Sequence, residues 1–362
     1  MDEKVLEVLK FLESNGYEAY IVGGYVRDYL LGKKSHDIDI ATSATPKELL
    51  NIFDCITSTN DKYGSVSILY KNEKYDITTY RKEIKYESNR NPVKIKYIKD
   101  IKKDLLRRDF TVNTFCIDKH GQVLDFLNVR SDLDHKIIKT VGNPRYRLKE
   151  DALRILRAIR FATILDFNIE KKTQCFIKKY APLLKNLSTT RKKEELDKIF
   201  SSLNRERGRK IILDLKLDKQ LGLTNLKNIT MCDDLIGIWA QLDCDNLYPF
   251  TKLEKSHMTL IRSLLTEPQL DSYSIYKYGL YISTVVAQIQ KKDIALINEL
   301  YQNLPIKSKE EIALKGNDIA TILNKPQGPY LKPLIEDLES QILSHNLPNT
   351  KEDLTKYLQT KY

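Results

Sequence analysis

Cysteine is scarce in this sequence, and long apolar runs are missing. Its cysteines are scattered without C-x-x-C spacing, at Cys55, Cys116, Cys175, Cys232 and Cys244. This scatter argues against a zinc site and fits a reduced, cytoplasmic compartment. No stretch approaches the length of a transmembrane span, and residues 1–20 have the pattern of a charged amphipathic helix, not of a signal peptide. We therefore expect a cytoplasmic protein with no membrane partner.

Acidic residues are outnumbered by basic ones. The chain has 60 Lys and Arg against 49 Asp and Glu, a formal net charge of +11, and a pI near 9.1. Such an excess is typical of proteins with a phosphate-rich partner. No run of lysines forms a basic tail, so a folded surface should bind any nucleic acid. With 362 residues the chain exceeds one typical core, which predicts two or more domains.

The first part of the chain has an α/β pattern. Strands are predicted at residues 18–24, 37–42, 64–72 and 74–81, and helices at 25–32 and 45–53. The second helix should start at Thr45 as its cap, with proline in its first turn. The last two strands should form a hairpin joined at Asn72 and Glu73. Residues 83–97 are polar and aperiodic, which predicts a mobile loop, and from about Leu148 onward the pattern is helical.

Two aspartates stand one residue apart in the predicted strand 37–42. Successive strand side chains point to opposite faces, so Asp37 and Asp39 should share one face. Their carboxylates repel each other unless a cation lies between them, and oxygen ligands suit a hard divalent ion. Asp76, on another predicted strand, could add a third carboxylate. An isolated D-x-D also fits a solvated edge strand, so the neighbouring motifs have to decide.

A glycine pair precedes these aspartates. Gly23 and Gly24 follow a predicted strand and open a predicted helix, where backbone N–H groups can face an anion without side-chain obstruction. Arg27, one turn later, can reach the same anion. A tight turn that needs glycine for steric reasons would give the same pair. A phosphate-binding turn followed at short range by two carboxylates predicts a nucleoside triphosphate site with two metal ions.

The segment from Glu150 to Leu165 has a second pattern that bears on function. Its apolar residues form one helical arc, and Arg154, Arg157 and Arg160 follow one another at three-residue spacing on the opposite side. Asp151 stands at the start of this series. A solvated basic face paired with Asp151 is the alternative interpretation.

Four motifs, in order, carry a resemblance to a known family. They are GGYVRDYLLG, HDIDIAT, RRDFTVN and EDALRILRAIRFA. In this order and spacing they resemble the class II tRNA nucleotidyltransferases, which include the CCA-adding enzymes, and the related bacterial poly(A) polymerases. The resemblance is strong from about Tyr20 to Leu165 and looser near the C-terminus.

The resemblance implies roles for several residues. In this family the RRD segment recognises the ribose, which points to Arg108 and Asp109. Asp151 and Arg154 would be an amino-acid template for the base. Cytosine and adenine offer an amino donor beside a ring-nitrogen acceptor, whereas uracil and guanine present the reverse, so a carboxylate beside a guanidinium favours C and A. Arg157 would hold triphosphate oxygens or order the template, as would the third arginine of the series, Arg160.

The resemblance also assigns a flexible loop that helps the switch from C to A. Tyr86 and Arg90 keep its pattern, whereas Ser88 and Asn91 depart from it. Thr190 likewise replaces a glutamate that the family usually has after the template helix. These departures bear on the efficiency of the final A addition.

The sequence as a whole predicts an α+β fold, with an N-terminal nucleotidyltransferase palm of mixed sheet and helices followed by an all-α neck, body and tail. The expected boundaries are 1–136 for the head, 137–205 for the neck, 206–290 for the body and 291–362 for the tail. The expected activity is Mg²⁺-dependent addition of C, C and A to the 3′ end of tRNA from CTP and ATP. The alternatives are a poly(A) polymerase, a CC-adding or A-adding enzyme of a split system, and a non-catalytic RNA-binding protein. The oligomeric state is left open.

Overall fold

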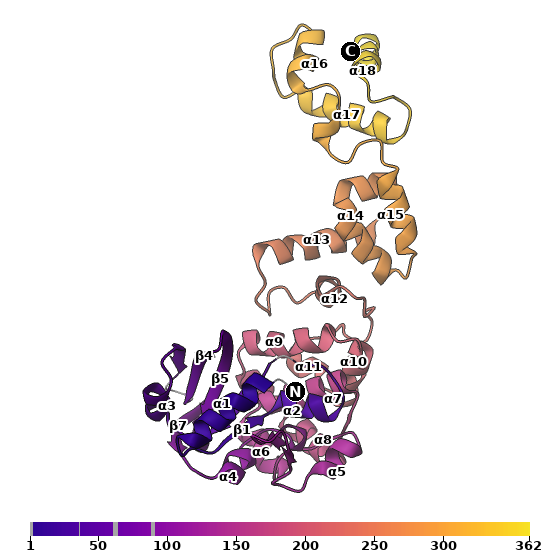
Figure 1. Cartoon of the computed structure of the whole chain (residues 1–362). Coiled ribbons are helices and arrows are strands. Elements are labelled where there is room, and N and C mark those ends of the chain that lie inside the picture. Colours follow the sequence, from indigo (N-terminus) through magenta and orange to yellow (C-terminus); the bar gives the residue numbers. More distant parts are fainter. Residues whose placement is uncertain (1–2, 36, 61–63, 88–90) are drawn as a thin grey trace. The chain divides into compact units, whose positions relative to one another are not determined.

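The computed structural model describes residues 3–35, 37–60, 64–87 and 91–362, and side chains except those of residues 83–94. The chain divides into two compact units, Met1–Lys227 and Asn228–Tyr362. Figure 1 shows the strands in the indigo and purple part of the chain and helices in the later part. In the described part of the chain, no helix is both long and apolar enough to cross a membrane.

A seven-stranded mixed sheet forms the centre of the first unit. Its order is β3-β4-β5-β2-β1-β8-β9. The strands are β1 Ala19–Val22, β2 Asp39–Thr42, β3 Ile56–Asn60, β4 Ser65–Tyr70, β5 Glu73–Thr79, β8 Cys116–Ile117 and β9 Val123–Leu124. All neighbouring pairs are antiparallel except β2 and β5, which run parallel. Burial alternates along β5, where Tyr75, Ile77 and Thr79 are buried, as a strand with one face on a core requires.

Helices before and after these strands complete the first unit. They are α1 Glu3–Ser14, α2 Gly24–Leu30, α3 Pro46–Ile52, α4 Ile101–Leu106, α5 Arg130–Asp134, α6 Pro144–Glu150, α7 Leu153–Leu165, α8 Lys171–Tyr180, α9 Thr189–Phe200, α10 Arg205–Asp214 and α11 Asp218–Leu221. The prediction for α3 is confirmed in detail, because Thr45 forms a capping box with Glu48 and Pro46 occupies the first turn. A small core cluster of Val22, Ala41, Tyr80, Leu105 and neighbours packs α4 against the sheet.

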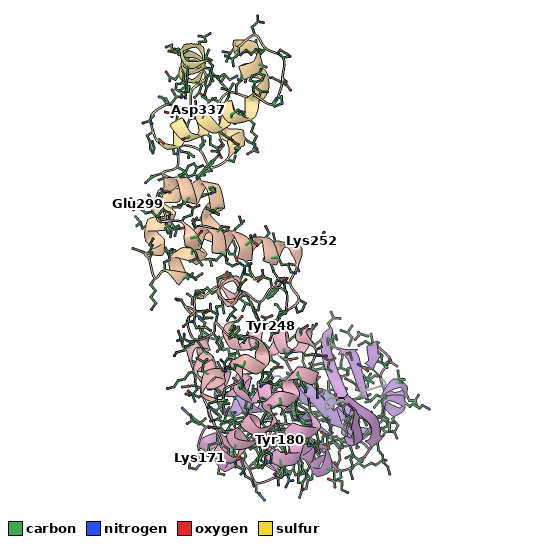
Figure 2. All side chains as sticks on the ribbon, turned by 180° about the vertical axis from the view of Figure 1, so that it is seen from behind. Lys171, Tyr180, Tyr248, Lys252, Glu299 and Asp337 are labelled. Carbon is green, nitrogen blue, oxygen red and sulfur yellow. The ribbon has the colours of Figure 1, made fainter. Side chains whose placement is uncertain are left out.

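The second unit has helices and no strands among its described residues, as predicted. Its helices are α12 Leu235–Leu242, α13 Lys252–Thr266, α14 Ser272–Ile289, α15 Ile294–Gln302, α16 Gly316–Ile322, α17 Leu331–Leu343 and α18 Lys351–Lys361. Trp239 is fully buried, and the centre of its ring lies 5.1 Å from that of Tyr248, which Figure 2 labels, with the two rings tilted at 52°. Asp337, also labelled there, forms an ion pair with Lys361 that joins α17 to α18, with 2.9 Å between Oδ1 of Asp337 and Nζ of Lys361.

The structure corrects several local predictions. The neck at 137–205 is not all-α, because β10 Ile137–Ile138 and β11 Asn168–Ile169 pair there as a parallel two-stranded sheet. Where a mobile loop was predicted at residues 83–97, β6 Arg81–Glu87 and β7 Asn91–Tyr97 pair as an antiparallel two-stranded sheet. The turn between β4 and β5 lies at Lys71 and Asn72, both with positive φ, one residue earlier than predicted. Strand β2 begins only at Asp39, so Asp37 precedes the strand instead of standing within it.

Candidate active site

A polar cavity of about 810 Å³ opens between the edge of the sheet and helix α7 in the first unit. Its size lies within the range typical of ligand pockets. Eleven of the residues singled out from the sequence line it: Gly23, Gly24, Arg27, Asp37, Asp39, Arg108, Asp109, Asp151, Arg154, Arg157 and Arg160. Arg81, Arg107 and Asn113 line it too and were not predicted. Seven arginines against four aspartates give this cavity the positive balance that a polyphosphate requires.

The glycine turn places backbone at the mouth of the site. Gly23 follows β1 and caps α2 with φ +81°, a conformation that favours glycine. A side chain at Gly23 would approach Oδ2 of Asp39 to 3.4 Å and Nη1 of Arg108 to 3.7 Å. The turn therefore keeps space free directly beside the acidic pair.

Three carboxylates lie near one another at the start of β2 and in β5. Asp39 pairs in register with Asp76 across the parallel strands. Burial raises the pKa of Asp39, the charge of Asp37 and that of Asp76 add to the rise, and Arg108 opposes it. This mutual repulsion is what a bound cation would relieve, so the acidic pair fits a divalent metal.

Asp76 differs from the other two carboxylates. It accepts a short hydrogen bond from the Ser67 hydroxyl. Within the described ranges, no group of three or more His, Cys, Asp or Glu side chains is arranged to hold a metal ion by itself. A metal at Asp37 and Asp39 would thus need further oxygen ligands from a substrate or water, which suits Mg²⁺.

The template candidates lie at a break between two helices. A single helix from residue 150 was predicted, but α6 ends at Glu150, and Asp151 is extended with φ −140° and ψ 104°. Its Oδ1 accepts a 2.9 Å hydrogen bond from the backbone N–H of Leu153, which caps the start of α7. Asp151 therefore stands at the N-terminal end of α7, in the cavity wall, and not on the helix itself.

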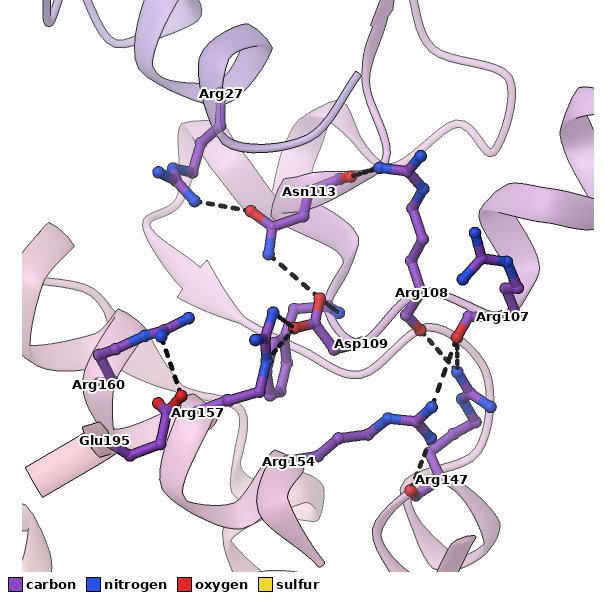
Figure 3. Close-up of polar contacts among 11 residues, drawn as sticks. Arg27, Arg107, Arg108, Asp109, Asn113, Arg147, Arg154, Arg157, Arg160 and Glu195 are labelled. Carbon is purple, nitrogen blue, oxygen red and sulfur yellow. Dashed lines mark hydrogen bonds and ion pairs between the residues drawn. The ribbon is translucent and has the colours of Figure 1, made fainter. Parts of the chain in front are cut away.

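Arg154 is buried, which excludes a solvated basic face for this residue. Its Nη1 donates to the backbone carbonyl of Arg147 at 2.8 Å and to Oε2 of Glu150 at 3.3 Å. Arg147 in turn donates to the carbonyl oxygens of Arg107 and Arg108, as Figure 3 shows. These contacts hold the guanidinium of Arg154 in one orientation against the RRD segment.

Arg157 is bound to Asp109. Its Nε and Nη2 lie 2.7 and 2.6 Å from Oδ2 of Asp109. Burial alone would raise the pKa of Asp109, but Arg157 and hydrogen bonds from Asn113 and the Phe110 N–H lower it to about 2. Burial would likewise lower the pKa of Arg157, yet Asp109 raises it above its ordinary value.

Arg160 makes a buried ion pair that the sequence did not predict. Its Nη1 lies 3.0 Å from Oε1 of Glu195 on α9, and its guanidinium lies 4.4 Å from the centre of the Phe161 ring. Burial lowers the pKa of Arg160 and raises that of Glu195, while each partner opposes the other's shift. Glu195 stands in the segment where Thr190 departs from the family pattern, so the partner of Arg160 is retained despite that departure.

The predicted loop residues are described only in part. Arg90 lies outside the described residues, and so do Ser88 and the side chain of Asn91. The backbone of Tyr86 belongs to β6 and pairs with Pro92, but its side chain lies outside the description. Their role stays a prediction.

A mixed sheet whose edge combines an acidic pair, a glycine turn and an arginine-lined cavity defines a nucleotidyltransferase head. Residues 19–139 match the family model of the poly A polymerase head domain. Residues 166–221 match a probable RNA and SrmB-binding site of polymerase A, and residues 251–358 match a putative tRNA nucleotidyltransferase domain 2.

Similarity to known proteins extends over nearly the whole chain. The chain is 32% identical to a CCA-adding enzyme of Staphylococcus haemolyticus, covering 97% of this chain and 96% of that protein. It is 34% identical to one of Lactobacillus helveticus, with 98% and 96% covered. The crystal structure of the Bacillus stearothermophilus CCA-adding enzyme in complex with CTP has a TM-score of 0.88 at 26% identity, over 99% of this chain and 97% of that one. The chain belongs to the CCA-adding enzyme family and is a nucleotidyltransferase.

Proposed function

We propose that this chain adds C, C and A in turn to the 3′ end of tRNA, with CTP and ATP as substrates. One observation carries the proposal: the acidic pair and the Asp151–Arg154 pair line the same cavity. The first pair suits nucleotidyl transfer and the second suits a choice between bases. A relative solved with CTP, at 26% identity over nearly the whole chain, supports a cytidine nucleotide in this cavity.

Asp37 and Asp39 would hold Mg²⁺, with Asp76 as a further candidate ligand. Their oxygens are the donor type that Mg²⁺ prefers. Burial and, after it, the charge of Asp37 raise the pKa of Asp39, and a cation would relieve the repulsion between the two carboxylates. Bound there, two such ions would make the primer hydroxyl more acidic and neutralise the triphosphate in line with it.

In the reaction, the 3′ oxygen of the tRNA forms a bond to the α-phosphorus of the bound nucleotide. The bond from that phosphorus to its bridging oxygen breaks, pyrophosphate leaves, and the hydroxyl proton passes to solvent. Arg27 has two N–H donors that make no hydrogen bond to the residues that the structure describes, and we assign them to phosphate oxygens beside the glycine turn. Gly23 and Gly24 leave the backbone accessible there.

Base selection falls to Asp151 and Arg154. One carboxylate oxygen of Asp151 accepts from the Leu153 N–H at the start of α7. A carboxylate can accept several hydrogen bonds, so Asp151 can also accept one from the amino group of C or A. A guanidinium N–H of Arg154 would meet the ring nitrogen acceptor. Uracil and guanine would place a carbonyl against the carboxylate, and such mispairing of buried groups is strongly unfavourable. Arg108 and Asp109 would face the ribose, while Arg157 and Arg160 order the template helix.

The helical remainder would bind the tRNA. We keep the division into a head at 1–136, a neck at 137–205, a body at 206–290 and a tail at 291–362, with Tyr86 and Arg90 in a loop that supports the change from C to A. The net charge of +11 suits RNA phosphates. Free cysteines suit a reducing compartment, so we place the reaction in the cytoplasm.

The test gives purified protein a tRNA that lacks its last three nucleotides, with each triphosphate singly and with CTP plus ATP. We expect two C residues with CTP alone and CCA with both, and little use of UTP or GTP. Long A tails on unrelated RNA would instead identify a poly(A) polymerase. A stop after the second C would identify a CC-adding enzyme, and a requirement for tRNA that already ends in CC an A-adding one. No transfer at all would favour a non-catalytic RNA-binding protein.

A further inference from the structure

Asn113 lies between Arg27 and Asp109 and contacts both, as Figure 3 shows. Its Oδ1 accepts a 2.7 Å hydrogen bond from Nη1 of Arg27. Its Nδ2 donates a 3.2 Å hydrogen bond to Oδ1 of Asp109. The side chain is only 7% exposed and lines the cavity. One amide thus joins a residue of α2 to a residue that follows α4.

The contact with Asn113 fixes how the guanidinium of Arg27 is turned. Nε and Nη2 of Arg27 each donate to the Asp28 carboxylate at 2.9 Å. With Nη1 on Asn113, three of the five N–H donors of this arginine are used. The other two belong to Nη1 and Nη2, which lie 4.0 and 3.5 Å from where a Cβ on Gly24 would stand. The unused donors therefore lie beside the glycine turn.

The second contact of Asn113 completes the partners of Asp109. Oδ2 of Asp109 is taken by Nε and Nη2 of Arg157. Oδ1 accepts from the Phe110 N–H at 2.8 Å and from Asn113. These four contacts hold the carboxylate of Asp109 in one orientation in the cavity wall. Loss of Asn113 would leave Oδ1 with one of its two donors.

From these contacts we infer that Asn113 is a positioning residue for nucleotidyl transfer, which couples the orientation of Arg27 on the phosphate side to that of Asp109 on the ribose side. An amide suits this place because one of its atoms accepts from a guanidinium and the other donates to a carboxylate. Aspartate there would offer acceptors alone. The inference rests on the proposed function, since it takes the nucleotide to occupy this cavity.

The test compares Asn113→Ala and Asn113→Asp with the unmodified protein. The measurements are the dissociation constants of CTP and dCTP, the KM and kcat for CTP on tRNA, and the melting temperature. Asn113→Ala should weaken CTP binding and raise its KM by about tenfold, the effect of losing one hydrogen bond to a charged group. It should also narrow the preference for CTP over dCTP, while tRNA affinity stays unchanged. Asn113→Asp keeps the acceptor for Arg27, so it should narrow the ribose preference with a smaller change in KM.

Asn204→Ala is the matched control. Asn204 makes a 3.1 Å hydrogen bond to the carbonyl of Thr163 on α7, and it is not among the residues that line the cavity. Its loss should lower the melting temperature and leave CTP binding and ribose preference unchanged. A double-mutant cycle with Arg27→Ala adds a second criterion, because the effect of Asn113→Ala on the affinity for CTP should largely vanish when Arg27 is gone, whereas its effect on the ribose preference, through Asp109, should remain.

A folded Asn113→Ala protein with unchanged CTP affinity and ribose preference overturns the inference, and so does full additivity with Arg27→Ala in the affinity for CTP. If the alanine variant fails to fold, the same two criteria are applied to Asn113→Asp, where an unchanged ribose preference overturns it. CTP binding is measured without tRNA, so it reports on Asn113 even if the unmodified protein transfers no nucleotide. Absence of transfer by the unmodified protein would count against the proposed function instead.

Discussion

At the scale of single residues, the proposed chemistry depends most on two carboxylates, that of Asp39 at the start of β2 and that of Asp37 just before it. Asp37 and Asp39 lie close enough for the charge of one to raise the pKa of the other. Groups whose pKa values are shifted by like charges are concentrated at functional sites. Both side chains line the cavity that the arginines also line. Their role should therefore be catalytic and not structural.

Asp37→Ala or Asp39→Ala should abolish transfer of every nucleotide and leave tRNA binding intact. Each substitution removes a metal ligand, so transfer is lost. Each also removes the repulsion between the two carboxylates, so the stability of the fold should change little. The measurement is nucleotide incorporation beside tRNA affinity from gel shift. Asp54→Ala, an exposed aspartate of the same domain, is the matched control and should behave as the unmodified protein. Equal loss of tRNA binding and transfer in the Asp37 or Asp39 variants would indicate a structural role.

Two ion pairs, one buried and one partly exposed, join separate elements around the template helix α7. Arg157 reaches Asp109, which follows α4, and Arg160 reaches Glu195 on α9. Each pair closes a long stretch of chain and holds α7 against a neighbour. The orientation of α7, and with it the position of Arg154, therefore depends on charges on other elements.

Removal of only one partner of the buried Arg160–Glu195 ion pair should lower the stability of the fold by a large amount. Glu195→Ala would leave the buried Arg160 guanidinium without its carboxylate, which should cost about 3–5 kcal/mol in the free energy of unfolding. Replacing both residues by leucine should recover most of this loss, since no buried charge remains. Urea denaturation of the single and double variants measures both values. A single variant as stable as the unmodified protein would show that the pair is not buried in solution.

Asp109 predicts an acid-sensitive contact between α7 and the RRD segment. Its folded pKa of about 2 lies below the ordinary value of 3.8, so its contribution to stability is present above pH 4 and is lost as pH falls from about 4 to about 2. The lowering corresponds to about 2 kcal/mol at neutral pH. The free energy of unfolding is measured against pH for the unmodified protein and for Asp109→Asn, and the difference between the two curves gives the contribution of Asp109. Parallel curves between pH 5 and pH 2 would contradict the assignment.

Sequence patterns predicted the elements whose information is local. The cap at Thr45 and the alternation along β5 are contained in a few neighbouring residues, and the structure confirms both. The hairpin β6–β7 was missed because its residues are polar and lack the alternation that a buried face imposes. The break at Asp151 was missed because its sequence continues a helical pattern across the junction.

The sequence predicted most of the residues that line the site, but it did not predict which residues they contact. The motifs assigned Asp109 and the arginines of α7, which the cavity brings together. Their partners could not be read from spacing, because Glu195 is 35 residues from Arg160 and Asn113 is 86 residues from Arg27. Asn113 ends the RRDFTVN motif, and that position was the one signal that could have drawn attention to it.

The charge of the whole chain governs how it should bind its RNA partner. A net charge of +11 predicts that the association constant for tRNA falls log-linearly with salt, by about a hundredfold or more between roughly 50 and 200 mM. Filter binding over a salt series measures the slope. CTP binding to the isolated protein serves as the comparison and should change much less. A flat response for tRNA would mean that phosphate contacts contribute little.

The most direct measurement sequences the 3′ ends made on truncated tRNA in the presence of all four triphosphates. The unmodified protein should produce ends that read CCA, without U or G, because the acceptor of Asp151 and the donors of Arg154 match the edges of C and A alone. Asp151→Ala should still transfer nucleotides, since Asp37 and Asp39 are intact, but with U and G now among the added bases. Added ends that stay CCA in the Asp151→Ala protein, or an unmodified protein that adds bases without preference, would contradict a base-selecting role for this cavity.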